Sequence, residues 1–175
     1  SEFRKIITVR STYVVSILAL LIIGFFSFYG SGYKGVIFAP DTLMQTAMQA
    51  ISIVGIFVGI LAIIHISHEY RYNTVGYTIT ASNSRLKVML AKFTVAGAYG
   101  LLMTLLTIVL AFAMVMAGAA LAGKEIGQQT IELWPLLWKS IFFMVSSAWF
   151  GLVLGLLSRS LAFSIVIYFF LPIVE

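Results

Sequence analysis

Apolar stretches with at most a few charged residues recur along the chain and are separated by shorter polar segments. They cover residues 12–29, 44–67, most of 85–123, 135–157 and 161–174. A helix rises about 1.5 Å per residue, so about 20 residues cross the ~30 Å hydrocarbon core of a bilayer. The pattern therefore predicts five membrane helices in these five ranges.

Two of the five ranges differ in length from an ordinary membrane helix. The range 85–123 would overshoot the bilayer and becomes apolar only after Lys92, so we expect its first two turns to stand in the cytoplasm. The range 161–174 is short, so we expect it to enter the membrane without crossing it in the usual way. A buried or re-entrant segment is the alternative for this range.

Residues 1–10 (SEFRKIITVR) combine apolar and basic side chains at helical spacing. Phe3 and Ile6 belong to one apolar stripe, whereas Arg4 and Lys5 lie off that stripe. This pattern predicts an amphipathic helix that lies on the inner leaflet before the first span. A frayed basic tail is the alternative.

The composition supports a membrane protein. Apolar residues make up 61% of the 175 residues and charged residues only 10%, against about 45–50% and about 25% in soluble globular proteins. A soluble domain of this size could not hide so much apolar surface, because much of its exterior must be hydrated. The mean hydropathy of +1.07 excludes a soluble enzyme, a nucleic-acid-binding domain and a disordered tail. The absence of cysteine excludes disulfides and thiolate metal sites.

The basic residues predict an orientation. If the N-terminus is cytoplasmic, the outer side carries only Lys34, Lys124 and Lys139 of the eleven Lys and Arg residues. Trp134 and Trp138 then stand where an outer aromatic belt is expected. The other eight basic residues fall on the inner side, as the positive-inside rule requires: Arg4, Lys5, Arg10, Arg71, Arg85, Lys87, Lys92 and Arg159. We therefore expect a multi-pass protein of the plasma (cytoplasmic) membrane with its N-terminus inside.

Two stretches match phosphate-binding motifs by letter alone. Residues 30–35 (GSGYKG) fit the dinucleotide pattern, and residues 118–125 (GAALAGKE) resemble the P-loop up to its lysine. No strand is expected before either stretch, and Glu125 replaces the Ser or Thr that binds magnesium in a P-loop. We therefore interpret 30–35 as a flexible exit turn and expect no nucleotide or other cofactor on this chain.

Candidate catalytic and metal-binding groups are scarce. His65, His68 and Glu69 share one helix face, but no second cluster of His, Asp or Glu completes a coordination sphere. We favour interfacial or docking roles for these three residues. No span contains a carboxylate pair or a Ser/His set for intramembrane hydrolysis, so we expect neither a metal site nor an enzyme.

Small residues predict close helix packing. Gly55 and Gly59 in the second span, and Gly151 and Gly155 in the fourth, are each spaced four residues apart. Such pairs remove side chains from one face and let helices approach closely in lipid. We favour packing within the chain, with a subunit interface as the alternative.

The polar segment 68–84 joins two spans on the inner side. Together with the adjoining Arg85 it contains the sequence HEYRYNTVGYTITASNSR, which alternates polar, aromatic and basic residues. A short cytoplasmic helix here would suit docking onto a soluble partner, and an ordinary solvated loop is the alternative.

At this segment the sequence resembles the permease subunits of type-2 ABC exporters (the ABC-2 membrane family). The resemblance rests on Glu69, Asn73-Thr74, Ser82 to Ser84, Arg85 and Ala91-Lys92. Residues 148–175 resemble the fourth and fifth spans of the family, with a tight turn at Ser158 to Ser160. Residues 1–10 resemble its elbow helix.

The resemblance implies an all-α, polytopic permease with six spans that forms a homo- or heterodimer on two ABC ATP-binding subunits. ATP and magnesium would bind the partner ATPase subunit, and rigid-body gating would switch the dimer between inward- and outward-facing states. The segment 68–84 would be the coupling helix. The contact residues are then Glu69, Tyr70, Arg71, Tyr72, Thr74, Val75 and Arg85.

The same resemblance places the translocation path along the second and fifth spans, near the dimer axis. Its lining would include Phe57, Ile60, Phe163, Tyr168 and Phe169. Such a lining favours a hydrophobic or amphipathic cargo over an ion, because an ion path needs polar partners at depth.

The alternative function is a non-transporting accessory or sensor subunit of a membrane complex, in which cargo would not stimulate ATP hydrolysis.

The chain begins without methionine, and five passes would leave Glu175 outside. We therefore expect a longer chain with at least one more membrane helix after Glu175.

Overall fold

The computed structural model describes residues 10–34, 41–71, 85–123, 132–158 and 160–170. In these ranges every regular element is helical, so the prediction of an all-α protein is confirmed. The elements are α2 (Arg10–Phe26), the π-helix η1 (Ser27–Tyr33), α3 (Thr42–Arg71), α5 (Arg85–Leu121), α6 (Leu133–Ser158) and α7 (Leu161–Phe170).

Four stretches are long and apolar enough to cross a membrane. They are Ser11–Tyr33, Thr42–His68, Leu86–Leu121 and Leu133–Ser158, and Leu161–Phe170 is a shorter apolar helix. The prediction of a polytopic helical membrane protein is therefore confirmed.

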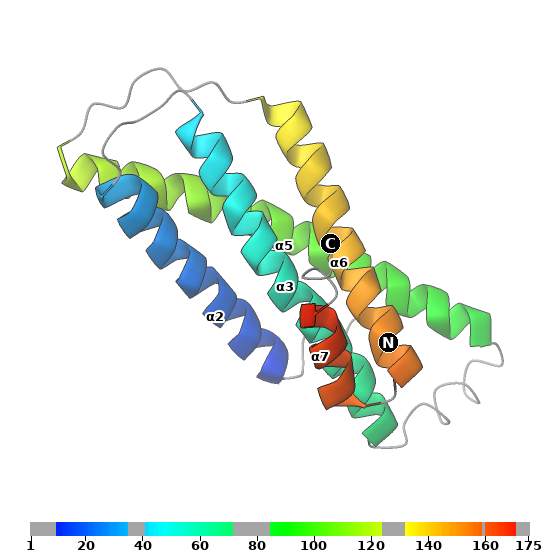
Figure 1. Cartoon of the computed structure of the whole chain (residues 1–175). Coiled ribbons are helices and arrows are strands. Elements are labelled where there is room, and N and C mark those ends of the chain that lie inside the picture. The colour runs from blue at the N-terminus through cyan, green and yellow to red at the C-terminus, as the bar shows by residue number, and fades with distance from the viewer. Residues whose placement is uncertain (1–9, 35–40, 72–84, 124–131, 159, 171–175) are drawn as a thin grey trace.

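The helices alternate in direction between two ends of a bundle (Figure 1). At one end α2 and α5 begin and α3 and α6 end, and we call it the Arg10 end. At the opposite end, the Lys34 end, η1 finishes and α3 and α6 begin. The long helix α5 crosses behind α3 and α6 in Figure 1 and packs against both. The short helix α7 folds back on α6 and lies against α3.

The helix bounds extend or shorten several predicted ranges. α3 continues through His68 to Arg71, so the polar segment predicted from 68 begins as helix. The rest of that segment (72–84), the predicted elbow helix (1–9) and the chain end (171–175) lie outside the described residues. α6 begins two residues before Pro135. Proline is tolerated there because the N–H groups of the first helical turn have no intrahelical partners.

The expected exit turn at 30–35 is wrong for residues 30–33, which continue the helix as η1. The Lys34 N–H donates to the Tyr29 carbonyl at 2.8 Å, the five-residue spacing of a π-helix. A Cβ added to Gly32 would stand 2.8 Å from the Val115 carbonyl oxygen and 3.0 Å from the Gly118 Cα. Backbone contact with α5 therefore holds these residues helical.

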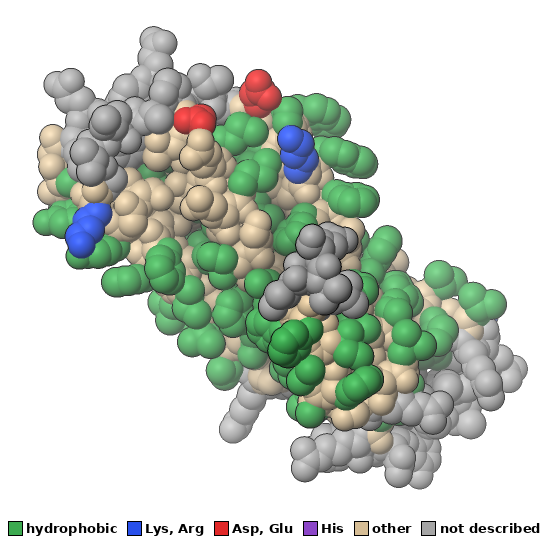
Figure 2. Space-filling model, viewed as in Figure 1, with side chains coloured by type: hydrophobic (Ala, Val, Ile, Leu, Met, Phe, Trp, Pro, Cys, Tyr) green, Lys and Arg blue, Asp and Glu red, His purple; other side chains and the backbone are tan. Residues whose placement is uncertain are grey.

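Charged and aromatic side chains mark the Lys34 end as a membrane interface. On the face that Figure 2 shows, the coloured acidic and basic side chains lie toward one end, with hydrophobic ones along the length. The exposed rings of Phe25, Tyr29 and Tyr33 stack in series, with centroid distances of 5.8 and 6.1 Å. The Lys34 ammonium lies 5.1 Å from the centre of the Tyr29 ring. Such aromatic groups are typical of the headgroup level of a bilayer.

Three buried hydroxyl groups are satisfied inside their own helices. Thr104 donates to the Gly100 carbonyl at 2.8 Å, and Thr107 donates to the Met103 carbonyl at 2.7 Å. Ser140 likewise donates to the carbonyl four residues earlier. Each of these side chains is fully buried, and their pairing lets polar residues stay among apolar ones away from water.

The closest contact between helices joins α3 and α6. A methyl group added to Gly151 would overlap the Gly59 carbonyl oxygen and stand 2.9 Å from the Gly59 Cα. One turn away on each side, a Cβ at Gly55 would meet the Phe143 ring at 2.5 Å, and one at Gly155 would meet the Ile66 side chain at 3.2 Å. The four predicted glycines thus all lie along this one crossing.

Tyr168 of α7 fills the space that Gly59 leaves open. Its hydroxyl donates to the Gly55 carbonyl at 3.2 Å, and its ring lies 5.9 Å from that of Phe150. The Tyr168 side chain is only 8% exposed, and a Cβ at Gly59 would overlap it. One tyrosine therefore ties α7 to both α3 and α6.

We expect Gly151→Ala to lower the free energy of unfolding by about 1–3 kcal/mol, because the added methyl group would separate two backbones. Thermal unfolding in detergent micelles measures the change. Gly30→Ala is the matched control, since nothing lies within 4 Å of a Cβ at Gly30. Equal stability of the two variants would contradict the close contact.

Tyr168→Phe removes only the hydrogen bond to Gly55 and should cost about 0.6 kcal/mol, the average for a side-chain hydrogen bond between membrane helices. Tyr168→Ala should cost about 3–5 kcal/mol because it also leaves a cavity. The same unfolding measurement applies. Phe169→Ala, at a neighbouring side chain that is 47% exposed, should change stability much less, and a loss as large as that of Tyr168→Ala would argue against the anchoring role.

Candidate functional site

The residues expected to couple to a partner flank the segment 72–84 at the Arg10 end. Glu69, Tyr70 and Arg71 form the last turn of α3, and Arg85 is the first residue of α5. The predicted contact residues Tyr72, Thr74 and Val75 lie outside the described residues. Both ends of the segment are therefore continuous with long membrane helices.

The Tyr70 side chain fixes the end of α3 in the bundle. It packs against a small apolar cluster of Ala62, Ile66 and Leu152, in which Phe93 also takes part. This cluster contains residues of α3, α5 and α6. The last turn of α3 is thus held by packing on two neighbouring helices.

Trp149 of α6 holds the third turn of α5, at Phe93. Its indole N–H donates to the Phe93 carbonyl at 3.0 Å, and the two rings meet edge to face at 6.0 Å. A Cβ at Gly97 would stand 3.4 Å from the indole nitrogen, so the glycine lets the ring approach the backbone. The residues on both sides of 72–84 therefore rest on the same helix, α6.

Polar contacts tie α2 into the same end of the bundle. The Thr12 hydroxyl and the His65 Nε2 are 2.9 Å apart, and the Ser16 and Tyr99 hydroxyls are 2.5 Å apart. His65, considered above as a metal ligand, therefore contacts α2 through Thr12. No three His, Asp or Glu side chains come together within the described ranges.

The residues expected to line a translocation path fall into two groups. Phe57 and Ile60 are half-buried on α3, and Phe163 and Phe169 are exposed on α7. Tyr168 departs from that expectation, because its side chain is buried against α3 and holds the fold together.

An exposed polar stripe on α3 was missed by the sequence analysis. Asp41, Gln45, Gln49 and Ser52 follow one another at spacings of four, four and three residues, and all four side chains are exposed. The Gln45 amide donates to the Asp41 carboxylate, and the Ser52 hydroxyl donates to its own helix at Met48. The available signal was the helical spacing of these polar residues within a span that had been identified by hydropathy alone.

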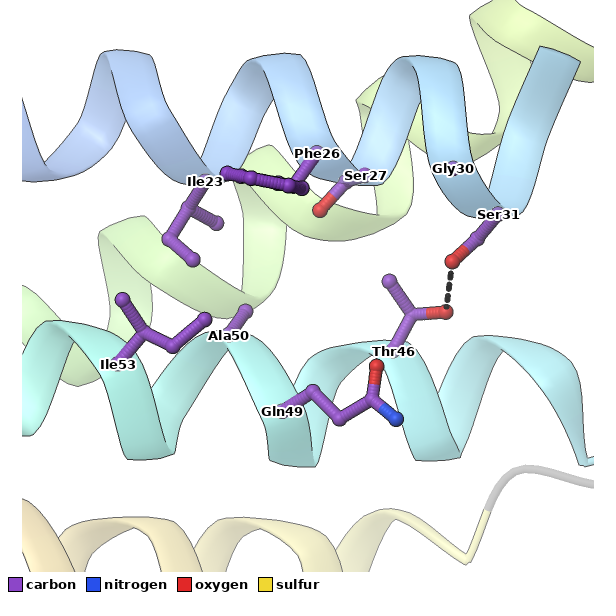
Figure 3. A pocket seen from close by; sticks show the side chains of 9 residues that line it. All are labelled: Ile23, Phe26, Ser27, Gly30, Ser31, Thr46, Gln49, Ala50 and Ile53. Atoms are coloured by element: carbon purple, nitrogen blue, oxygen red, sulfur yellow. Dashed lines mark hydrogen bonds between the residues drawn. The ribbon is translucent and has the colours of Figure 1, made fainter. Parts of the chain in front are cut away.

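A pocket of about 300 Å³ borders this stripe, between α3 and the α2–η1 helix (Figure 3). Ser31 and Thr46 are joined across it by a hydrogen bond of 2.9 Å. The wall residues are Ile23, Phe26, Ser27, Gly30, Ser31, Thr46, Gln49, Ala50 and Ile53.

Comparison with known proteins agrees with this architecture. A family model described as "ABC-2 family transporter protein" matches residues 1–175, which is the entire sequence. Neither a curated protein nor a solved structure matches the chain. With a helical bundle of membrane-length spans and a family match over its whole length, the chain belongs to the ABC-2 family, whose members are membrane-spanning permease subunits of ABC transporters.

Proposed function

We propose that this permease subunit forms the translocation path of an ATP-driven exporter as a dimer and couples to separate ATP-binding subunits at its Arg10 end. The observation that carries the proposal is the exposed polar stripe of Asp41, Gln45, Gln49 and Ser52 along a membrane-spanning helix. ATP and magnesium act on the partner subunit, and this chain supplies the path and the moving helices.

The stripe is unfavourable against lipid. Gln49 lies seven residues inside α3, which is about 10 Å of helix from its first residue. No hydrogen bond joins its amide to another described residue, and an amide in hydrocarbon without a partner costs several kcal/mol. Water in a path, or polar groups of a second subunit, would satisfy it. The stripe therefore supports a path between two permease subunits on this face of α3.

The apolar residues expected on the path lie further along the same helix and on α7. Phe57 and Ile60 follow the polar stripe along α3, and Phe163 and Phe169 lie on α7, which packs against α3. A path that is polar near the Lys34 end and apolar further inside suits a hydrophobic or amphipathic cargo. No ionisable side chain of α3 lies between Asp41 and His65, which favours such a cargo over an ion.

The Arg10 end is suited to transmit a displacement from a partner subunit to the membrane helices. Tyr70 packs the last turn of α3 near α6, and Trp149 of α6 bonds α5 at Phe93, in its third turn. A displacement of that segment by ATP-driven closure of the partner would therefore move α3, α5 and α6 together, as a rigid body rather than as separate helices. The basic residues of this end favour a position on the cytoplasmic side of the plasma membrane, where ATP is available.

Single cysteines test the path directly, because the chain has none of its own. In the dimeric complex we expect Gln49→Cys to react with a membrane-impermeant maleimide, whereas Leu21→Cys, deeper on the exposed face of α2, stays protected. The expected ratio of rates exceeds about tenfold, since each ~1.4 kcal/mol that opposes thiolate formation in lipid slows the reaction tenfold. Protection of Gln45→Cys, Gln49→Cys and Ser52→Cys alike would favour the accessory-subunit alternative.

Charge reversal tests the docking end. Glu69→Lys should leave membrane insertion intact but weaken assembly with the ATPase subunit, because losing one partner of a partly desolvated charge pair costs about 2–5 kcal/mol. Co-purification and cargo-stimulated ATP hydrolysis are the measurements. Glu132→Lys makes the same change at the Lys34 end and should behave like the native protein. Normal assembly and transport in Glu69→Lys would contradict docking at this end.

A further inference from the structure

The pocket between α3 and the α2–η1 helix has a polar and an apolar half. α2 runs toward the Lys34 end and α3 away from it, so the order of residues gives their depth. Ser27, Ser31, Thr46 and Gln49 bring hydroxyl and amide groups, and Ile23 and Ile53 stand at the deeper ends of the two walls (Figure 3). The pocket therefore changes from polar near the membrane surface to apolar toward the bilayer centre.

Two polar groups in the wall lack partners within the described part of the chain. The Ser27 side chain is 3% exposed, yet its hydroxyl makes no hydrogen bond to a described residue. Figure 3 shows the Ser27 hydroxyl directed into the space between the helices, and the Gln49 side chain, which also lines the pocket, lying along α3. The Ser27 hydroxyl is therefore available to hydrogen-bond a group bound in the pocket.

The chemistry of the wall restricts what can bind. None of the nine wall residues is charged, so nothing there would compensate an ionic headgroup as it lost water. Hydroxyls and an amide both donate and accept hydrogen bonds and suit a polyol or amide head. The volume of about 300 Å³ is at the lower end of the ~300–1,000 Å³ range of small-molecule sites, enough for a compact head and the start of one chain.

The backbone at the pocket is also unusual. Ser27, Gly30 and Ser31 belong to η1, a π-helix of seven residues. π-helical turns are rare and occur frequently at functional sites. The packing of Gly32 against α5 explains why the segment stays helical, but it does not explain why polar groups from this turn face α3 instead of lipid.

From these observations we propose that the pocket binds an amphiphile with an uncharged, hydrogen-bonding head and a single apolar chain, which enters sideways from the outer leaflet. The head lies against Ser27, Ser31 and Gln49, and the chain passes Ile23, Phe26 and Ile53 toward the bilayer centre. The amphiphile is either a membrane lipid or the transported cargo, which share this chemistry. The assignment to the outer leaflet rests on the proposed function, which puts the Arg10 end in the cytoplasm and the Lys34 end outside.

Native mass spectrometry of the purified complex, without ATP, tests the site with three amphiphiles that carry the same acyl chain. We expect the uncharged monoacylglycerol to be retained saturably, and lysophosphatidylcholine and lysophosphatidylglycerol at least about tenfold less, a difference of ~1.4 kcal/mol. Gly30→Trp, which fills open space in the pocket wall, and Gln49→Leu should each weaken monoacylglycerol retention about tenfold. Phe25→Trp, a bulky change on the exposed face of the same helix, is the matched control and should retain it.

Equal retention of the three amphiphiles, or retention that neither Gly30→Trp nor Gln49→Leu reduces, would overturn the proposal. Unchanged helical content by circular dichroism shows that each variant is folded. Monoacylglycerol that also stimulates ATP hydrolysis by the complex would be cargo-like, and one that binds without stimulation would be a resident lipid. Binding is measured without ATP, so the pocket proposal can be confirmed even if coupling to an ATPase subunit is refuted. Coupling can likewise be confirmed even if the pocket binds no amphiphile.

Discussion

Backbone contact between Gly59 and Gly151 is the interaction on which the rest of this bundle depends. In lipid, apolar burial does not drive helices together, so close packing and hydrogen bonds must do so. The two glycines bring α3 and α6 into contact, and Tyr168 then occupies the remaining space and fastens α7. Because α6 and α7 cover one side of α3 in this way, the side that carries Gln49 is left exposed.

The placement of polar groups separates structural from functional surfaces. Thr104, Thr107 and Ser140 are buried and bonded to their own helices, so they add no exposed polarity. Gln49 is different, because its side chain is exposed within a membrane-spanning helix. An exposed amide at that depth favours contact with water, another subunit or a ligand. The proposed path face and the pocket share Gln49, which would relate a bound amphiphile to the transport route.

The two ends of the molecule are held differently. Near the Arg10 end, Tyr70 and Trp149 link α3 and α5 to α6, so a displacement there would be shared by several helices. At the Lys34 end, α3 meets the α2–η1 helix across a pocket that the Ser31–Thr46 hydrogen bond crosses. This arrangement suits a subunit that receives force at one end and binds amphiphiles near the other.

The sequence by itself determined the all-helical, polytopic character of the protein and the position of its membrane-length helices. It could do so because lipid forces each spanning segment to satisfy its own backbone, which makes length and hydropathy sufficient. Resemblance in the segment after α3 also indicated the family. The π-helical course of residues 30–33, the inward position of Tyr168, the exposed stripe and the pocket were decided only by the tertiary structure. Each of them depends on which neighbour covers which face of a helix, and residues far apart in the chain, such as Gly32 and Gly118, settle that together.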